Sequence, residues 1–316
     1  MSVVVFGSAN MDIIVRSPRF PAAGETIIGS SVHTMPGGKG ANQAVAAARL
    51  GCRTAFVGRV GADAFGSELR RSLADAGVDV SGLRTDSRSE TGIACIVVDD
   101  TAENRIIIVA GANDAVGGDD LDWLRIELHR SRILLVQLEL RLDLVAEAVR
   151  AAAAEDVRVI ADPAPAPLEP LPKEFFQPHV VLTPNETEIE ALVGYSVATD
   201  ESACRAAVEL TARGTGAVAV KLGARGVCWS TGDVAEIVRP PAVVAVDSVG
   251  AGDAVNGALA AALTEDLPFR TAVRWAVAAG ALAVTRPGAQ PAMPNRQEVL
   301  ACVSEMDQTT ARDSRP

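Results

Sequence analysis

Short runs of β-branched residues alternate along the chain with longer stretches rich in alanine and leucine. Short apolar runs are typical of buried strands, and the longer stretches between them are typical of helices. The sequence therefore predicts strands at residues 3–6, 53–60, 133–138, 157–161, 180–183 and 217–222. It predicts helices at residues 40–50, 65–76, 142–154 and 254–263. This order indicates βαβ units and an α/β fold: a three-layer, doubly wound, mostly parallel sheet with helices on both faces.

Two segments break this alternation. Residues 26–36 and 91–110 are rich in strand-forming side chains but have no helix between their strands, and the polar run 99–103 divides the second segment like a hairpin turn. Such strands do not easily join a parallel sheet. Together with residues 12–16 they predict a small separate β-sheet that folds over the ligand edge as a lid. The alternative is an antiparallel edge of the main sheet.

The chain has 316 residues, of which 48% are hydrophobic, so it can bury a sizeable core. We expect one α/β domain over residues 1–305, with the lid strands as part of it. The polar residues 306–316 predict a disordered tail.

Charge and cysteine usage exclude several classes of protein. With 29 basic and 40 acidic residues the net charge is −11, which argues against general nucleic-acid binding. A single nucleotide can still bind where backbone N–H groups and one or two cations converge. The five cysteines are dispersed without a Cys-x-x-Cys pair, as in reduced cytosolic proteins, and no metal-binding spacing is present. We find no signal-peptide pattern or membrane span, so we expect a cytoplasmic protein.

The first candidate for chemistry is the run Pro-Gly-Gly-Lys-Gly-Ala-Asn at residues 36–42, directly before a helix. Its glycines let the backbone approach a ligand, and the helix N-terminus offers free N–H groups. Lys39 adds a mobile cation and Asn42 a group that both donates and accepts hydrogen bonds. The alternative is a plain strand-to-helix turn, and the spacing is not that of a Walker A loop.

The second candidate is Asp-Ser-Val-Gly-Ala-Gly-Asp at residues 247–253, followed by a helix of small residues. Consecutive small residues at a helix start form an anion-binding nest, whose N–H groups can face charge that develops on a transferred phosphoryl group. Asp253 is then placed to accept a proton from a hydroxyl that attacks phosphorus. The alternative is a helix-capping aspartate after a glycine turn.

Two further runs carry weaker signals. Asn185 and Glu188 lie one helical turn apart after a predicted strand, where their oxygens suit Mg²⁺ but equally suit an ordinary helix cap. Residues 221–226, Lys-Leu-Gly-Ala-Arg-Gly, form a glycine-bracketed turn at a strand end. A nucleotide could lie across this turn, and a plain β-hairpin is the alternative.

Together these runs resemble the PfkB-type carbohydrate kinases. They occur in the family's order, starting from Asn-Met-Asp at residues 10–12. The resemblance continues through residues 21–26, 110–113, 137–139, 162–166 and 285–291 and covers the chain from residue 3 to about 303. It implies a kinase domain with a lid that pairs two subunits into a homodimer. It also implies ATP, Mg²⁺ and K⁺ as cofactors, and phosphorylation of the 5-hydroxyl of D-ribose.

The resemblance also implies roles for individual residues. The sugar would be held by Asn10, Asp12, Gly38, Lys39, Gly40, Ala41, Asn42 and Glu139. Asp253 would be the base, with Gly250, Ala251 and Gly252 as the anion hole. The nucleotide would contact Asn185, Lys221, Leu222, Gly223, Ala224, Arg225, Gly226 and Gly252. Glu188 would lie near Mg²⁺, and K⁺ would bind at Asp247, Val249, Ala283, Arg286 and Gly288.

Three positions depart from the family's pattern: Lys221 replaces a threonine, Val277 a histidine and Ala292 a serine. Within the class, the alternatives are kinases for 2-deoxyribose, another sugar or a nucleoside. From another class, the alternative is a non-catalytic protein that senses a sugar or a nucleotide. The intact Asp253, nest and Lys39 speak against that last alternative.

Overall fold

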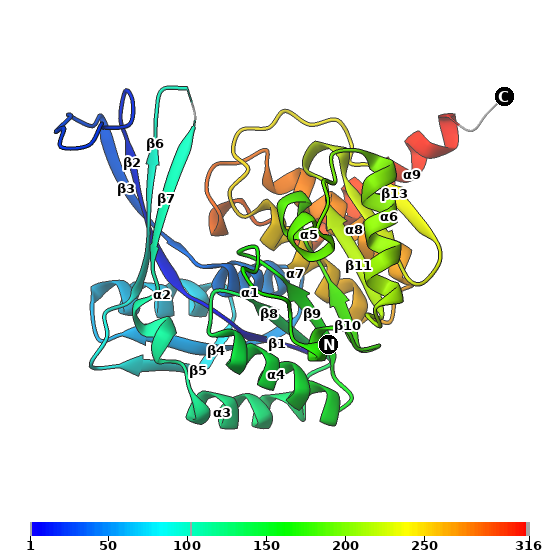
Figure 1. The fold of residues 1–316 in the computed structure, drawn as a ribbon, viewed down its shortest axis with the longest axis horizontal. Coiled ribbons are helices and arrows are strands. Elements are labelled where there is room, and N and C mark those ends of the chain that lie inside the picture. The colour runs from blue at the N-terminus through cyan, green and yellow to red at the C-terminus, as the bar shows by residue number, and fades with distance from the viewer. Residues whose placement is uncertain (1, 102, 314–316) are drawn as a thin grey trace.

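The computed structural model describes residues 2–101 and 103–313 and contains two sheets of different character (Figure 1). Among these residues, nine strands form the main sheet in the order β13-β12-β11-β10-β9-β8-β1-β4-β5. Its members are β1 (Ser2–Phe6), β4 (Arg53–Gly61), β5 (Asp79–Asp86), β8 (Ile133–Gln137), β9 (Arg158–Asp162), β10 (Val180–Leu182), β11 (Ala217–Lys221), β12 (Val227–Ser230) and β13 (Ala235–Val238). Neighbours from β5 to β11 are parallel, whereas β12 pairs antiparallel with both β11 and β13. The predicted mostly parallel sheet is therefore confirmed.

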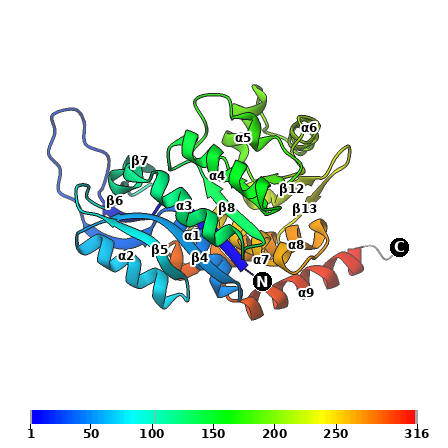
Figure 2. The same ribbon diagram turned by 90° about the horizontal axis from the view of Figure 1, so that it is seen from below.

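Helices cover both faces of this sheet, as Figure 2 shows from below. One face carries α1 (Lys39–Arg49), α2 (Ala64–Asp75), α7 (Ala251–Thr264), α8 (Phe269–Ala283) and α9 (Arg296–Asp313). The other carries α3 (Gly118–Leu128), α4 (Leu142–Ala154), α5 (Glu186–Val193) and α6 (Asp200–Ala212). Val3 and Val5 of β1 pack in the first core, and Val4 and Phe6 in the second. A strand buried on both faces has no polar position, which explains its continuous apolar run.

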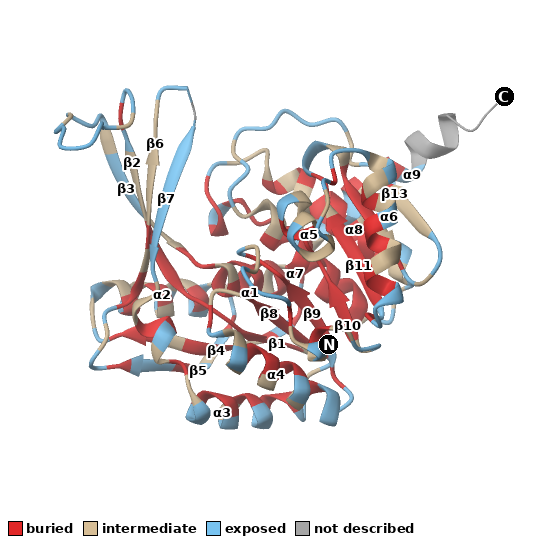
Figure 3. Ribbon diagram, in the orientation of Figure 1, coloured by how far each residue is buried: buried red, intermediate tan, exposed pale blue. Residues whose placement is uncertain are grey.

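The lid strands form a separate four-stranded sheet within the described residues, in the order β3-β2-β6-β7. They are β2 (Asn10–Arg16), β3 (Ser31–Gly37), β6 (Gly92–Val98) and β7 (Asn104–Val109). The separate small sheet is thus confirmed, and the alternative of an added edge on the main sheet is wrong. Strand β3 starts at Ser31 and not near residue 26, because Gly29 is a poor strand former and interrupts the apolar run before it. The sheet projects from the main body, and its outer parts are exposed (Figure 3).

The predicted disordered tail begins inside a helix. Helix α9 continues to Asp313, because residues 304–313 contain neither glycine nor proline to stop it. Met306 is buried against the core, and Asp307 pairs with Arg274. Residues 314–316 of that prediction lie outside the described residues. Within the described residues, no helix is long and apolar enough to cross a membrane.

Helices α1 and α7 lie side by side and approach each other at small residues. A Cβ atom added to Gly257 of α7 would lie 2.4 Å from the Cβ of Ala46 in α1. Real atoms do not come that close, so this crossing requires a glycine. The two helices start at the carboxyl ends of the parallel strands, which is the edge where ligands bind in open α/β sheets.

Candidate active site

Asp253 lies in the first turn of α7 and is buried, with 7% of its surface exposed. Its two oxygens accept amide hydrogen bonds from consecutive residues of α1. Asn42 Nδ2 donates to Oδ2 at 3.0 Å, and Gln43 Nε2 donates to Oδ1 at 3.1 Å. A carboxylate oxygen can accept two hydrogen bonds, so each keeps capacity for one more partner. Asp253 can therefore accept a proton from a bound hydroxyl.

The nest before Asp253 depends on glycine at its first position. Gly250 caps α7 in the left-handed region with φ 76°, and a Cβ atom there would lie 2.9 Å from the Cα of Ala289. The N–H groups of Ala251 and Gly252 belong to the first helical turn, where backbone donors have no intrahelical acceptor. Ala251 bonds back to Ser248, while the turn as a whole lines the pocket described below. This arrangement can bind an anion.

Lys39 lies among acidic side chains at the start of α1. The preceding Gly38 has φ 87°, and a Cβ atom there would be 2.6 Å from the backbone nitrogen of Asn10. Burial opposes the charge on Lys39, but the surrounding carboxylates outweigh burial and raise its pKa. These are the side chains of Asp253, Asp162, Glu139 and Glu188. Lys39 is therefore held as a cation at the centre of the site.

The predicted sugar residues gather on the lid side of Asp253. Asp12, on β2 at the root of the lid, is 7% exposed. Burial raises its pKa to about 7, and the charges of Glu139 and Asp253 add to that effect. Glu139 follows β8 and accepts from the Ser8 hydroxyl and, at 3.1 Å, from the Lys39 backbone nitrogen. We call Asp12, Glu139, Asp162 and Asp253 the carboxylate cluster.

The other predicted sugar residues are placed close by. Asn10 begins β2, and its side-chain oxygen accepts from Asn113 Nδ2 at 2.8 Å. Gly40 and Ala41 are buried in the first turn of α1, where the Ala41 nitrogen donates to Ser8. Asn42 Oδ1 is buried and has no hydrogen-bond partner in the part of the chain that the structure describes. That oxygen therefore has unused capacity to accept a hydrogen bond.

Asp162 is a site residue to which the sequence analysis gave no role. It ends β9 and is 2% exposed. Lys221 Nζ donates to its Oδ1 at 2.7 Å, while Gln43 Nε2 and Asn256 Nδ2 donate to its Oδ2 at 3.1 and 2.8 Å. The available signal was an aspartate at the carboxyl end of a buried parallel strand, where ligand sites form.

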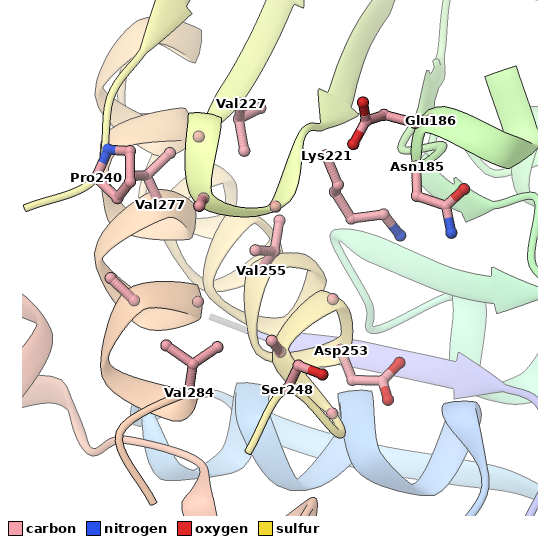
Figure 4. A pocket seen from close by; sticks show the side chains of 18 of the residues that line it. Asn185, Glu186, Lys221, Val227, Pro240, Ser248, Asp253, Val255, Val277 and Val284 are labelled. Carbon is pink, nitrogen blue, oxygen red and sulfur yellow. The ribbon is translucent and has the colours of Figure 1, made fainter. Parts of the chain in front are cut away.

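A pocket of about 690 Å³ extends from Asp253 between α7, α8 and the β11–β12 turn (Figure 4). Its inner end is polar, with Lys39, Asp162, Lys221 and the nest. Its outer end is apolar, lined by Val227, Pro240, Val255 and Val277, while Val284 lies beside Ser248 (Figure 4). A ligand with a charged group at one end and a flat apolar group at the other would match this gradient.

The residues predicted for a nucleotide are only partly brought to this pocket. Asn185, Lys221, Gly223, Ala224 and Gly226 line it, and the last four lie at the hairpin turn between antiparallel β11 and β12. The turn is therefore a β-hairpin that also borders the pocket. Two predicted side chains lie elsewhere. Leu222 is buried behind the turn, and the Arg225 guanidinium pairs with Glu186 and Asp200.

The predicted cation ligands are already engaged within the protein. Glu188 and Asn185 form a capping box, in which both Glu188 oxygens accept from Asn185 at 2.7 and 2.8 Å. Burial raises the pKa of Glu188. Asp247 accepts from the backbone nitrogens of Val249 at 3.0 Å and Gly288 at 2.8 Å, and so joins the two predicted K⁺ segments.

The other two predicted K⁺ ligands belong to the second of these segments. The Ala283 carbonyl accepts from the Arg286 nitrogen at 3.2 Å. The Arg286 guanidinium points away to pair with Glu298. Among the described residues, no three or more His, Cys, Asp or Glu side chains are arranged so that they could hold a metal ion by themselves.

Comparison with known proteins accounts for this arrangement. A family model described as pfkB family carbohydrate kinase matches residues 1–296. The chain is 39% identical to the ribokinase of Haemophilus influenzae, over 95% of this chain and 97% of that protein. It is 33% identical to the deoxyribokinase of Salmonella typhi, over 94% of this chain and 97% of that protein. The structure of Arabidopsis thaliana ribokinase complexed with ribose and ATP superposes with a TM-score of 0.87 at 36% identity, covering 96% of this chain and 98% of that one. The chain therefore belongs to the pfkB family of carbohydrate kinases.

Proposed function

We propose that this protein phosphorylates D-ribose at its 5-hydroxyl with ATP. The observation that carries the proposal is the position of Asp253, a buried carboxylate with free acceptor capacity, between the sugar residues on its lid side and the nest at the polar end of the pocket. The relatives that share nearly the whole chain include ribokinases, which supports ribose as the acceptor.

In this proposal Asp253 takes the proton from the 5-hydroxyl as that oxygen attacks the γ-phosphorus of ATP. Gly250, Ala251 and Gly252 line the pocket, where their N–H groups would stabilise the charge that develops on the transferred phosphoryl group, and Lys39 would add a cation. Catalysis of phosphoryl transfer consists mainly of positioning and electrostatic stabilisation, and both are supplied here by buried groups.

The sugar hydroxyls would be held by the short polar side chains around Asp253. Asn10, Asp12, Asn42 and Glu139 offer oxygen acceptors and amide donors at the lid root, and Gly38, Gly40 and Ala41 let the backbone approach. Asn42 supplies the clearest single contact. Its buried side-chain oxygen has no hydrogen-bond partner within the described part of the protein, which is costly, and a sugar hydroxyl would supply that partner.

The nucleotide would lie along the pocket with its phosphates toward the nest and Lys221. Asn185, Gly223, Ala224 and Gly226 would border its middle, and the adenine would rest on the valines at the apolar end. Leu222 would support the turn from behind. Arg225 would contact the nucleotide only after leaving Glu186 or Asp200.

The donor chemistry fits both cations. Mg²⁺ keeps most of its waters and binds through one or two carboxylates plus phosphates, so Glu188 can hold a Mg²⁺-bound water with its remaining lone pairs. A bound Mg²⁺ would neutralise phosphate charge. K⁺ would sit at Asp247 with carbonyls of Val249, Ala283, Arg286 and Gly288, and it would stiffen the segment leading into the nest.

A homodimer through the lid and a cytoplasmic location complete the proposal. Strand β7 is a sheet edge with four consecutive exposed apolar residues, which a second subunit would cover. The five cysteines are free thiols, as expected in a reducing compartment.

The deoxyribokinase among the relatives makes 2-deoxyribose a second candidate substrate. A test measures kcat/KM for ribose, 2-deoxyribose and adenosine with MgATP and locates the phosphate ester by ³¹P NMR. We expect the order ribose, 2-deoxyribose, adenosine, and an ester at C5. Adenosine is expected last because neither lid segment, 26–36 or 91–110, contains a phenylalanine, tyrosine or tryptophan to stack on a base. An adenosine value at or above that of ribose would overturn the sugar assignment, and ligand binding without turnover would indicate a sensor.

A further inference from the structure

Gln43 is a fully buried residue of α1 that neither lines the pocket nor has a role in the proposed reaction so far. Its Nε2 atom donates to Asp253 Oδ1 at 3.1 Å and to Asp162 Oδ2 at 3.1 Å. An amide nitrogen carries two hydrogens, so each is used on a different carboxylate. One side chain thus joins two members of the carboxylate cluster.

The orientation of this amide is fixed from behind. Gln137 ends β8, and its Nε2 donates to Gln43 Oε1 at 2.7 Å. A reversed Gln43 amide would set its oxygen against two carboxylates and its NH₂ group against another NH₂ group. The network therefore selects a single arrangement, in which Gln43 offers only hydrogens to the cluster.

We propose that Gln43 is a positioning residue, which orients Asp253 for proton transfer and couples it to Asp162. The proposal rests on the proposed role of Asp253 as the base. Asp162 cannot take that role as readily, because Lys221, Asn256 and Gln43 already donate to it. The path Lys221–Asp162–Gln43–Asp253 also connects the nucleotide end of the pocket with the base.

Gln43 also acts on the acidity of Asp253. Burial raises the pKa of Asp253 to about 6, the charge of Asp162 raises it too, and Lys39 together with the amide donors lowers it. Charged groups face this site from every neighbouring element: Lys39 on α1, Asp12 on β2, Glu139 after β8, Asp162 on β9, Glu188 on α5 and Lys221 on β11. Without the Gln43 hydrogen, the ionised form of Asp253 loses one of its two amide donors and its pKa rises further.

The test is the pH profile of kcat/KM for ribose in Gln43→Leu. A hydrogen bond to a charged group is worth enough to move a pKa by about one unit. The acid limb of the profile should therefore shift upward by about one unit, with a loss of about 5- to 10-fold below pH 6 that shrinks above pH 8. The KM for ATP should change less than kcat/KM for ribose, since Gln43 does not itself line the pocket and reaches it only through Asp162 and Asp253.

Two further variants separate positioning from general destabilisation. Gln137→Leu frees the Gln43 amide without touching a carboxylate, and it should shift the limb in the same direction by a smaller amount. Thr264→Val removes a buried hydroxyl at the far end of the same helix as Asp253, and it should leave the limb in place. An unshifted limb in a folded Gln43→Leu protein, or an equal shift in Thr264→Val, would overturn the proposal.

A direct titration distinguishes failure of this inference from failure of the proposed function. The ¹³C carboxyl signal of Asp253, assigned by its loss in Asp253→Asn, reports the pKa without substrate. An upward shift in Gln43→Leu would support the coupling even if ribose proved not to be the substrate. No shift would refute the coupling, whatever the enzyme phosphorylates.

Discussion

The carboxylate cluster and strand β7 of the lid differ in what each leaves unsatisfied. In the cluster, Asp162 and Asp253 are buried and accept hydrogen bonds from amides and from Lys221, and both line the pocket. In β7, Ile106, Ile107, Ile108 and Val109 are each about half exposed or more, without a covering layer among the described residues. The carboxylate cluster can still accept hydrogen bonds, whereas the apolar side chains of β7 remain exposed to solvent.

This difference indicates which kind of molecule completes each region. Free acceptors on buried carboxylates match the hydroxyls of a small sugar, because unpaired buried polar groups are costly. Exposed apolar side chains on a sheet edge match a second protein surface, because contiguous apolar patches mark interaction sites. Substitutions in the two regions should therefore affect different measurements.

The largest effect is expected for Asp253→Asn. Loss of the base should reduce kcat by about 10²–10⁴-fold, with ribose and ATP still bound because the amide keeps the shape of the side chain. Steady-state kinetics measure kcat, and calorimetric titration measures the affinity for ribose. Activity within a few-fold of the unsubstituted protein would remove Asp253 from the mechanism.

A substitution in the lid should change the oligomeric state of the protein and not the rate of phosphoryl transfer. Ile107→Asp places a charge on the apolar edge in both copies of a symmetric dimer, and the dissociation constant should rise by at least about 100-fold. Sedimentation or light scattering at micromolar concentration gives the oligomeric state. Leu168→Asp is the matched control, since Leu168 is fully exposed outside the lid. A dimer unaffected by Ile107→Asp would argue against pairing through β7.

The carboxylate cluster should lower stability as pH rises. The pKa of Asp12 is about 7 in the folded protein and 3.8 as its ordinary value, so the folded state binds the extra proton between these values. Stability from this group is greatest below about pH 4 and is lost as pH rises through 7. Asp12→Asn should therefore raise the free energy of unfolding by about 1–2 kcal/mol at pH 8, at the expense of ribose affinity. Urea unfolding at pH 5 and pH 8 measures the change in the free energy of unfolding. An equal change at both pH values would contradict the electrostatic cause.

The smallest effect concerns the monovalent cation. K⁺ should increase the rate about 2- to 5-fold over Na⁺ at equal ionic strength, which is less than about 1 kcal/mol of barrier. Asp247→Ala should abolish the difference, because the remaining ligands would be neutral carbonyls. Identical rates in K⁺, Na⁺ and tetramethylammonium would refute this site.

The sequence predicted those parts of the fold whose pattern is set by burial on both faces. Strand β1 and its parallel neighbours have continuous apolar runs, whereas β5 contains only Val80 and Leu83 among polar residues and glycine and was not predicted. Edge strands need only one apolar face, so their pattern is weaker. Strand β12 was implied only by the β-hairpin alternative at residues 221–226, and β13 was not predicted.

In the candidate site too, features set by neighbouring residues could be predicted, whereas contacts between residues far apart in the sequence could not. The glycine runs around residues 38 and 250 were visible because left-handed backbone and close approach require glycine locally. The roles of Gln43 and Asp162 were not, because their hydrogen bonds join positions far apart in the sequence. In the sequence, Gln43 looks like any other residue of a predicted helix. Its role becomes visible only in the fold, which brings its hydrogen-bond partners together.

The close packing of α1 and α7 at Gly257 fixes the relative positions of the site residues at the first turns of these two helices. Gly257 and Ala46 bring the two helices into close contact, and hydrogen bonds join Asp253 to Asn42 and Gln43 at the first turns of these helices. Asn10 and Asp12 belong to β2, which extends into the lid. Two of the proposed sugar ligands therefore come from a lid strand and the base from the helix pair, so substitutions in separate parts of the chain can alter sugar binding and proton transfer.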